Sequence, residues 1–218
     1  MIPVITKRSS DAKKLKGEIM WYLNIPRTLV GHVPSLISHD ETTFSSYRLE
    51  RINGLTFSEL FLSESLTQEG LLKLLNVLDT IHTSQKCNEK INIYQNYTKK
   101  LKERYESYNY SKFENSERVY KKLVKSLGEY QENSQGKLGM IHGDPVFSNV
   151  LLDRLGKVKL IDPRGVLGDT ITVFGDIMYD YAKVYQSLIG YDEILQDKTI
   201  SDEFKTGVIG CFEKYILD

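Results

Sequence analysis

The sequence of 218 residues contains few cysteines, carries no net charge and lacks a long apolar run, and each shortage excludes a class of protein. Its two cysteines, Cys87 and Cys211, lie far apart and have no metal-binding spacing. We expect free thiols in a reducing compartment, with a single disulfide left open as the alternative. The 29 basic and 29 acidic side chains cancel, so neither nucleic acid nor an anionic membrane is expected as a partner.

Two further absences concern targeting and phosphate binding. No apolar run approaches the roughly 20 residues that cross a bilayer, and the first residues show no signal-peptide pattern, so we expect a cytoplasmic protein without a membrane partner. No G-x-G-x-x-G or comparable glycine-rich phosphate loop occurs in the chain. Hydrophobic residues at 40% and charged residues at 27% are ordinary for a globular protein. The length suits one large domain or two small lobes around a cleft.

The first part of the chain, residues 1–53, predicts a small α+β lobe. The pattern favours a strand, a helix and two further strands, at residues 2–7, 11–23, 33–38 and 43–52. The first strand contains Lys7 at its end, and the last two are separated by a turn-like Asp40-Glu41. The dipeptide Asn53-Gly54 predicts a turn that closes this part.

The second part, residues 54–218, is predicted to be mainly helical. Its clearest signal is an amphipathic stripe of Leu71, Leu74, Leu75, Leu78 and Ile81, with Ser65 or Thr67 available as the N-cap. Further helices are expected near residues 119–130, from 176 to 188 and through 212–215. Between them the β signal returns at residues 150–152 and 157–161, joined by a turn at 153–156, which predicts a hairpin.

Three side chains around this hairpin have the chemistry of a phosphoryl-transfer site. Such a site needs a carboxylate to orient the attacking hydroxyl and oxygen ligands for Mg²⁺. Asp144 and Asn149 lie five positions apart, the interval between the aspartate and asparagine of a protein-kinase catalytic loop. Asp162 follows the hairpin, which is expected to fold it back beside the preceding loop. The three are therefore expected to meet, although each alone would more often be a turn residue.

Two motifs resemble the aminoglycoside phosphotransferase and choline kinase superfamily, namely HGDPVFSN at residues 142–149 and IDPRG at residues 161–165. The later residues Gly175-Asp176, Tyr179-Asp180 and Ala182-Lys183-Val184 are similar to phosphotransferases associated with capsule and surface-polysaccharide synthesis. The resemblance implies an α+β, protein-kinase-like bilobal fold that uses ATP and Mg²⁺. Its N-terminal lobe would be truncated, at residues 1–53, and its C-terminal lobe, residues 54–218, mainly helical.

The resemblance also implies roles for individual residues. Asp144 would be the catalytic base, and Asn149 and Asp162 would hold Mg²⁺. Lys7 is similar to the strand lysine that contacts the ATP phosphates, and Glu18 to the helix glutamate that pairs with this lysine. On the residues alone, Lys7 is as readily a surface lysine, and the role of Glu18 depends on it.

The same resemblance places the adenine-binding hinge at residues 48–52, so Glu50 and Ile52 are expected to contribute to nucleotide binding through backbone groups. His142 would brace the catalytic loop rather than touch substrate. Asp176 stands where a helix is expected to begin and has a simpler interpretation as its N-cap.

These features predict a phosphotransferase that moves a phosphoryl group to a hydroxyl of a small metabolite, with a sugar or sugar derivative as the first choice. The superfamily normally has two strands and a glycine-bearing loop before the position of Lys7, and here only six residues precede it. This difference favours one alternative, a catalytically silent kinase-like module that binds a partner. Another is an open sheet edge that pairs with a second copy or with a partner chain.

The segment between residues 86 and 130 is rich in lysine, arginine and tyrosine, and two interpretations are open for each feature. The tyrosines suggest either half-buried packing or an aromatic cage for a cation, and packing is the commoner outcome. The basic excess suggests either a solvated helix face or a site for an anionic substrate such as a sugar phosphate, and we expect the solvated face. A cationic aminoglycoside is disfavoured because the chain is neutral overall.

Overall fold

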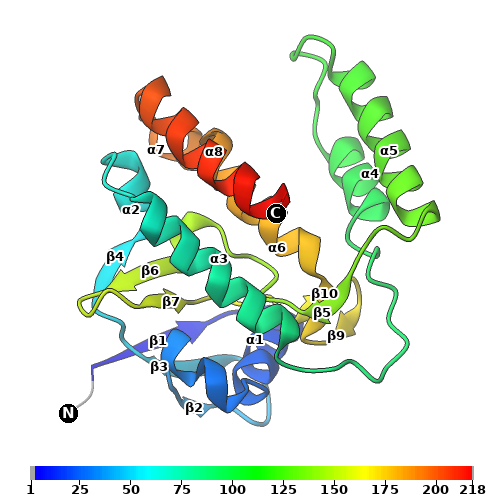
Figure 1. Cartoon of the computed structure of the whole chain (residues 1–218). Helices are drawn as coiled ribbons and strands as arrows, with labels where there is room; N and C mark the ends of the chain where they lie inside the picture. Colours follow the sequence, from blue (N-terminus) through cyan, green and yellow to red (C-terminus); the bar gives the residue numbers. More distant parts are fainter. Residues whose placement is uncertain (1–2, 218) are drawn as a thin grey trace.

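The computed structural model describes residues 3–217. The predicted strand at residues 2–7 begins at Ile2, which lies outside the described residues, as do Met1 and Asp218. The structure combines helices with small antiparallel sheets, which confirms the α+β prediction (Figure 1). No helix within residues 3–217 is both long and apolar enough to cross a membrane.

The N-terminal part is a three-stranded sheet with one helix packed against it. Strand β1 (Val4–Arg8) pairs with β3 (Ser46–Glu50), and β3 pairs with β2 (Leu36–His39), all antiparallel, in the order β1-β3-β2. Helix α1 (Ala12–Leu23) begins after Asp11, whose side chain accepts the backbone N–H of Lys14. The predicted strand, helix and two strands are therefore confirmed, with shorter bounds for both later strands.

Two local predictions in this part were wrong. Residues 43–45 were expected to be strand, but the Asp40 carboxylate accepts the backbone N–H groups of Thr42 and Thr43 and holds a turn there. Gly54 was expected in a turn, but it begins strand β4 (Gly54–Thr56), opposite Asp153 of β6 (Val150–Asp153). A Cβ at Gly54 would overlap the backbone of Leu152, so this glycine permits close strand approach.

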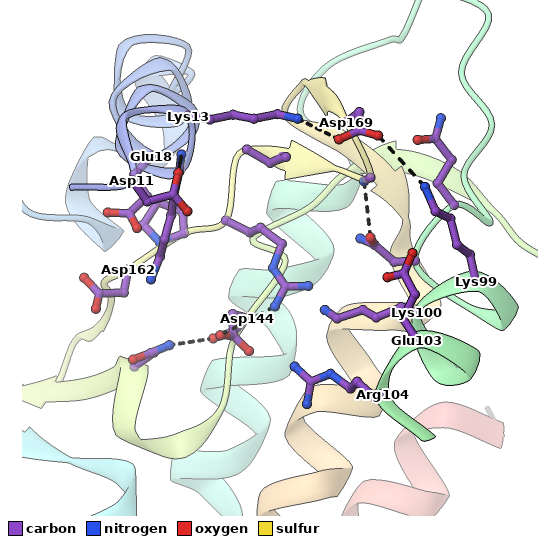
Figure 2. A pocket seen from close by; sticks show the side chains of 18 of the residues that line it. Asp11, Lys13, Glu18, Lys99, Lys100, Glu103, Arg104, Asp144, Asp162 and Asp169 are labelled. Carbon is purple, nitrogen blue, oxygen red and sulfur yellow. Dashed lines mark hydrogen bonds and ion pairs between the residues drawn. The ribbon is translucent and has the colours of Figure 1, made fainter. Parts of the chain in front are cut away.

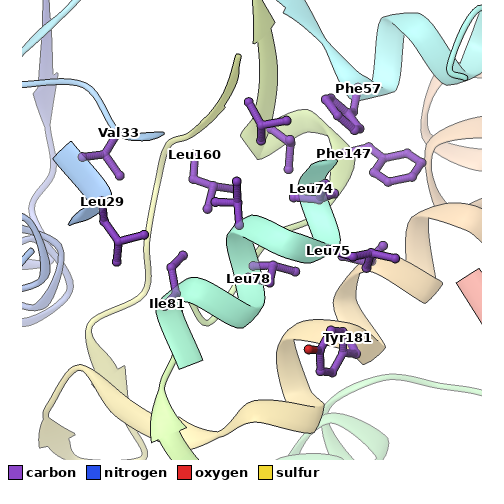
Figure 3. Close-up of a cluster of buried hydrophobic side chains, with 14 of the residues drawn as sticks. Leu29, Val33, Phe57, Leu74, Leu75, Leu78, Ile81, Phe147, Leu160 and Tyr181 are labelled. Carbon is purple, nitrogen blue, oxygen red and sulfur yellow. The ribbon is translucent and has the colours of Figure 1, made fainter. Parts of the chain in front are cut away.

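Helix α3 (Gln68–Thr83) runs through the centre of the molecule and carries the predicted leucine stripe. Thr67 is its N-cap, accepting the backbone N–H of Gly70. The side chains of Leu71, Leu74, Leu75 and Leu78 are fully buried. Figure 3 shows this face of α3 in a cluster of buried side chains that includes Leu160 and Phe147. One continuous core cluster extends from Leu15 on α1 to Phe212 near the C-terminus. At about 25 cal/mol per Å² of buried apolar surface, this stripe is a main source of stability.

The remaining helices and strands lie before and after α3 in the chain. They are η1 (Arg27–His32), α2 (Phe57–Leu62), α4 (Thr98–Ser107), α5 (Ser116–Glu132), β5 (Leu138–Met140), η2 (Phe147–Asn149), β7 (Val158–Leu160), β8 (Val166–Leu167), β9 (Thr170–Ile171), β10 (Phe174–Asp176), α6 (Ile177–Gln186), η3 (Ser187–Tyr191), α7 (Asp192–Gln196) and α8 (Asp202–Leu217). Helices α4 and α5 form a hairpin that stands apart from the other helices in Figure 1. No residue of α4 or α5 is buried in the described structure.

The β6–β7 hairpin confirms the prediction that positions the candidate site. Its strands pair from Val150 opposite Leu160 to Leu152 opposite Val158. The chain leaving β7 then runs beside the loop before β6, since Ile161 N–H donates to the Asn149 carbonyl at 3.0 Å and Arg164 N–H to the His142 carbonyl at 2.9 Å. The two sequence motifs are thus held together by backbone hydrogen bonds.

Candidate active site

A buried carboxylate on α6 anchors the loop that contains Asp144. Asp180 is fully buried and accepts the backbone N–H groups of His142 and Gly143, at 2.8 and 2.7 Å. Asp180 also contacts His82 of α3, whose Nε2 lies 3.1 Å from Asp180 Oδ2. Gly143 has a φ of +84°, and a Cβ there would lie 2.7 Å from the Cβ of Arg164. The loop conformation therefore depends on both the glycine and the carboxylate.

His142 lies inside the fold, in keeping with the expectation that it braces the loop. Its ring is completely buried, packs edge-on against Trp21 of α1, and accepts the backbone N–H of Asp144 at its Nδ1. Burial lowers the pKa of His142, although Asp180 and Asp144 act in the opposite direction. A neutral ring that accepts a hydrogen bond at Nδ1 is consistent with both observations.

Asp144 and Asn149 meet across the loop, as predicted. The side-chain Nδ2 of Asn149 donates to the backbone carbonyl of Asp144 at 2.9 Å. This bond fixes the amide so that its oxygen remains available to a ligand. The Asp144 carboxylate contacts two cations, with Lys183 Nζ 3.0 Å from Oδ1 and Arg164 3.9 Å from Oδ2.

Lys7, Glu18 and Asp162 form one ion-paired group. Lys7 Nζ lies 2.7 Å from Glu18 and 3.2 Å from Asp162, so strand β1, helix α1 and the segment after the hairpin meet at this ammonium group. Glu18 is only 2% exposed and also accepts the Tyr47 hydroxyl at 2.6 Å. Burial raises the pKa of Tyr47, and the hydrogen bond to Glu18 adds to this, so the hydroxyl stays a donor. The predicted lysine–glutamate contact is thus present in the structure.

Two cavities adjoin at Lys7 and Asp162. The larger, about 720 Å³, is polar and contains Lys7, Glu18, Asp144, Asn149 and Asp162 in its lining (Figure 2). The smaller, about 360 Å³, is mostly apolar. Its lining residues include Ile5, Pro34, Leu49, Glu50, Ile52 and Leu151. All seven residues predicted for catalysis, metal binding or nucleotide binding therefore line one of two connected cavities.

Of the predicted hinge residues, Glu50 and Ile52 line the smaller cavity, but the backbone N–H groups of this segment differ in availability. The Glu50 N–H donates to the Ser35 carbonyl, and the Glu50 carboxylate accepts the Ser35 hydroxyl. The Arg51 N–H donates to Pro3. Within residues 3–217 the Ile52 N–H has no hydrogen-bond partner, so it is the free donor of this segment. The aliphatic lining around it suits a flat aromatic base.

The donor set at the junction of the cavities fits Mg²⁺. This ion favours a few carboxylate or amide oxygens and retains several waters, so two protein ligands suffice. The Asn149 amide oxygen and the Asp162 carboxylate are of this kind. Asp162 also has a positive φ of 56°, a left-handed conformation uncommon outside glycine, as found at functional sites. Among residues 3–217 no group of three His, Cys, Asp or Glu side chains is placed to hold a metal ion.

Several cations near Asp144 were missed in the site prediction. Lys183 was included only as a member of the run Ala182-Lys183-Val184, and Arg164 only as a member of the IDPRG motif, without a role for either side chain. Lys100 and Arg104 of α4 line the same polar cavity and point from α4 toward Asp144 in Figure 2. The signal that could have identified these two is their spacing of four residues, which places them on one face of a helix.

The tyrosines nearby form a packed cluster. Tyr97 and Tyr130 donate their hydroxyls to Asp176, at 2.7 and 2.8 Å, and Tyr94 accepts the Gly136 N–H at 3.0 Å. Asp176 also accepts the N–H of Met178 and so caps α6, as predicted. These contacts favour the packing interpretation over a cage for a cation.

The fold is similar to that of solved choline kinases and aminoglycoside phosphotransferases. The choline kinase LicA from Streptococcus pneumoniae matches with a TM-score of 0.60 and 17% identity, over 97% of this chain and 68% of that one. Glucosamine kinase, in complex with glucosamine, ADP and inorganic phosphate, gives 0.62 and 12%, over 99% and 59%. Aminoglycoside phosphotransferase APH(4)-Ia, in complex with ADP and hygromycin B, gives 0.59 and 15%, over 88% and 67%. The chain thus spans roughly 59% to 68% of these proteins.

Within this class, the sequence matches one family. The family described as Seadornavirus VP7 matches residues 75–194, more than half of the chain, and the chain belongs to this family. The matched range includes both sequence motifs and Asp180.

Proposed function

We propose that the chain is an ATP- and Mg²⁺-dependent phosphotransferase that moves a phosphoryl group to a hydroxyl of a small metabolite, a sugar or sugar derivative. The observation that carries this proposal is the meeting of an apolar cavity and a polar cavity at Lys7 and Asp162. A base in the apolar cavity would direct its phosphates past Lys7 toward Asp144. The relatives in complex with AMP, ADP, hygromycin B and glucosamine support nucleotide binding and a small acceptor.

The position of each residue in the cavity suggests its chemical role in this proposal. Lys7, held by Glu18, would bind phosphate oxygens, and Asn149 and Asp162 would hold Mg²⁺, which supplies charge neutralisation at the phosphates. The Asp144 carboxylate would accept the proton of the acceptor hydroxyl. The acceptor oxygen then bonds to the terminal phosphorus, the bond from that phosphorus to the bridging oxygen breaks, and ADP leaves.

The first test is calorimetric titration with ATP, in the presence and absence of Mg²⁺. Wild type and Asp162→Asn are compared, because the substitution removes a carboxylate charge while keeping the size of the side chain. We expect Mg²⁺-dependent binding that Asp162→Asn abolishes or weakens at least about tenfold. Metal-independent binding, or equal affinity in the variant, would contradict the assigned role of Asp162.

The catalytic role of Asp144 is tested by Asp144→Ala in steady-state turnover. We expect a decrease of at least about 10³-fold, equivalent to about 4 kcal/mol of barrier, because the acceptor hydroxyl loses its orienting base. Binding of ATP with Mg²⁺ should change little, since Asp144 lies on the acceptor side. A variant that retains most of the wild-type rate would remove Asp144 from the mechanism.

The alternative is a catalytically silent module that binds a partner. The absence of a glycine-rich loop from the sequence favours it, since two or three missing charge-assisted hydrogen bonds at ~1.5–3 kcal/mol each remove about 3–9 kcal/mol of nucleotide binding. Lack of ATP binding up to about millimolar concentration in folded protein would support this alternative. The division of the chain into lobes at residues 53 and 54, and a cytoplasmic location, belong to the same proposal.

A further inference from the structure

The carboxylate of Asp144 is surrounded by positive charge from several elements. Lys183 of α6 and Arg164 contact it directly, at 3.0 and 3.9 Å. Lys100 and Arg104 of α4 line the same cavity from the opposite side, pointing toward Asp144 (Figure 2). Four cations thus gather at the place where an acceptor hydroxyl must lie.

The two α4 cations lack a balancing charge. Among residues 3–217, ion pairs occupy Lys99 with Asp169 and Lys102 with Glu106, but neither Lys100 nor Arg104 has one. Burial lowers the pKa of Lys100 to about 8, and Arg164, Arg104 and Lys183 add to the lowering, while Asp144 opposes it. A bound anion would reduce the charge repulsion between Lys100 and these three cations.

The acidic groups of this part of the cavity do not cancel the cations. Asp144 is already paired with Lys183 and Arg164, and Glu103 of α4 is the other acidic side chain beside Lys100 and Arg104. A cationic acceptor would therefore approach four positive groups against two negative ones. The expectation that the basic residues of this segment form a solvated face does not fit Lys100, which is half-buried at the cavity.

The nucleotide phosphates do not account for these cations. Lys7 and Asp162, where the apolar cavity joins the polar one, lie on the β1 and α1 side of the polar cavity. In Figure 2, Asp162 and Glu18 lie on one side of Asp144, and Lys100 and Arg104 on the other. The α4 cations thus face the acceptor rather than the base.

We propose that the acceptor carries a phosphate monoester, held by Lys100 and Arg104 with help from Arg164, so that the substrate is a phosphorylated hydroxyl compound such as a sugar phosphate. An arginine fork and a lysine are a common pair for phosphate recognition. The acceptor assignment rests on the proposed function, whereas the anion site itself does not.

The experiment is a calorimetric titration of inorganic phosphate into protein saturated with the nonhydrolysable nucleotide AMP-PNP and Mg²⁺, so that the nucleotide phosphate positions are filled. Wild type is compared with the double variant Lys100→Gln/Arg104→Gln. Lys102→Gln is the matched control, because Lys102 is exposed on the same helix and does not line the cavity. We expect the double variant to weaken phosphate binding at least about tenfold, with AMP-PNP affinity within about twofold and no effect of Lys102→Gln.

Equal phosphate affinity in wild type and the double variant would overturn the anion site, as would no binding up to about tens of millimolar phosphate. Choline that binds better than phosphate in the same assay would also overturn it. If AMP-PNP itself fails to bind, phosphate is titrated into the free protein. Binding that depends on Lys100 and Arg104 there would keep the anion site while the phosphotransferase proposal fails.

Discussion

At the level of single residues, Asp180 connects the loop that contains Asp144 to the helical core. Its oxygens accept two backbone N–H groups, and one of them also lies beside His82 Nε2. Both oxygens of this buried carboxylate therefore have a hydrogen-bond partner. Such charge-assisted bonds are worth more than neutral ones, and a buried donor left without a partner is costly. The geometry of Asp144 therefore depends on a residue that lies 36 positions later and never faces the cavity.

This dependence predicts the effect of Asp180→Asn. The amide offers one oxygen where the carboxylate offers two, so one backbone N–H meets an NH₂ group instead of an acceptor. We expect a loss of about 1.5–3 kcal/mol in the free energy of unfolding, measured by urea denaturation. Asp197→Asn, in an exposed left-handed position, is the control and should stay within about 0.5 kcal/mol of wild type. Equal effects of the two substitutions would show that Asp180 does not anchor the loop.

Lys100 gives the anion site a dependence on pH. Its pKa in the folded protein, about 8, is below the ordinary lysine value, so the side chain loses its proton as pH rises through about 8. Sulfate, whose charge is constant over this range, should then bind up to about tenfold more weakly at high pH. Arginine keeps its charge over this range, so Arg104 and Arg164 do not contribute to the change, which is assigned to Lys100.

The replacement Lys100→Arg tests whether Lys100 is the group that titrates. Arginine keeps its charge throughout, so sulfate affinity in this variant should stay flat up to at least pH ~9. The measurement is sulfate affinity by calorimetry at several pH values, with wild type in parallel. A variant that shows the same decrease as wild type would contradict the prediction for Lys100.

At the level of elements, the contact between α1 and the segment after Asp162 requires glycine on both sides. A Cβ at Gly17 would lie 2.8 Å from the Gly165 carbonyl oxygen and would also overlap Val166. A Cβ at Gly165, whose φ is +59°, would overlap the backbone of Gly17. The close approach of these backbones fixes α1, which carries Glu18, next to the segment that carries Asp162.

Gly17→Ala tests this contact. Alanine is the better helix former by about 1 kcal/mol, but the added methyl must displace packed backbone, and we expect a net loss of about 1–3 kcal/mol in stability. Gly128→Ala on α5 is the matched control, because a Cβ at Gly128 meets nothing within 4 Å and should stabilise by about 0.5–1 kcal/mol. Both are measured by urea denaturation. Stabilisation by Gly17→Ala would show that α1 does not need this contact.

The main elements of the site could be predicted from the sequence because their patterns are local. The leucine stripe indicates α3, and the strand alternation with the turn around Asp153 indicates the β6–β7 hairpin, which places Asp162 beside Asn149. The helix α4 and the strands β8 to β10 were not predicted. Helix α4 contains a single aliphatic residue, Leu101, and so lacks an apolar stripe, and β8 and β9 have only two residues each.

The direction in which a side chain points does not follow from the sequence. Lysines at 99, 100 and 102 look alike in the chain, yet among residues 3–217 Lys100 lines the cavity without an ion pair, Lys99 lines it beside Asp169, and Lys102 lies outside it and pairs with Glu106. Which face of α4 turns toward Asp144 is set by how the α4–α5 hairpin meets the rest of the protein, and no local pattern contains that information. The charge that faces the acceptor therefore depends on tertiary packing.

At the level of the whole molecule, the two predicted lobes share one core. Leu15 and Ile19 of α1 belong to the same buried cluster as α3 and the C-terminal helices. The Trp21 indole also donates to the Ile141 carbonyl at 2.7 Å, directly before the loop that contains Asp144. Because α1 is joined to the core in this way, changes in the packing of α1 should reach the loop of Asp144.

The N-terminal sheet also has an edge that predicts association. Within residues 3–217, β1 pairs only with β3, and its Val4 and Ile5 are 36% and 52% exposed. An unpaired, partly apolar strand is a template for a strand of a second copy or of a partner chain.

We expect the average mass of the purified protein to rise with concentration in sedimentation equilibrium. Val4→Lys should weaken this association at least about tenfold, because a charge on an edge strand opposes strand pairing. Val4 does not line the apolar cavity, so ATP binding should be unchanged in the same variant. A monomer mass at every concentration would leave the edge to a partner chain, and equal association in both proteins would place the contact elsewhere.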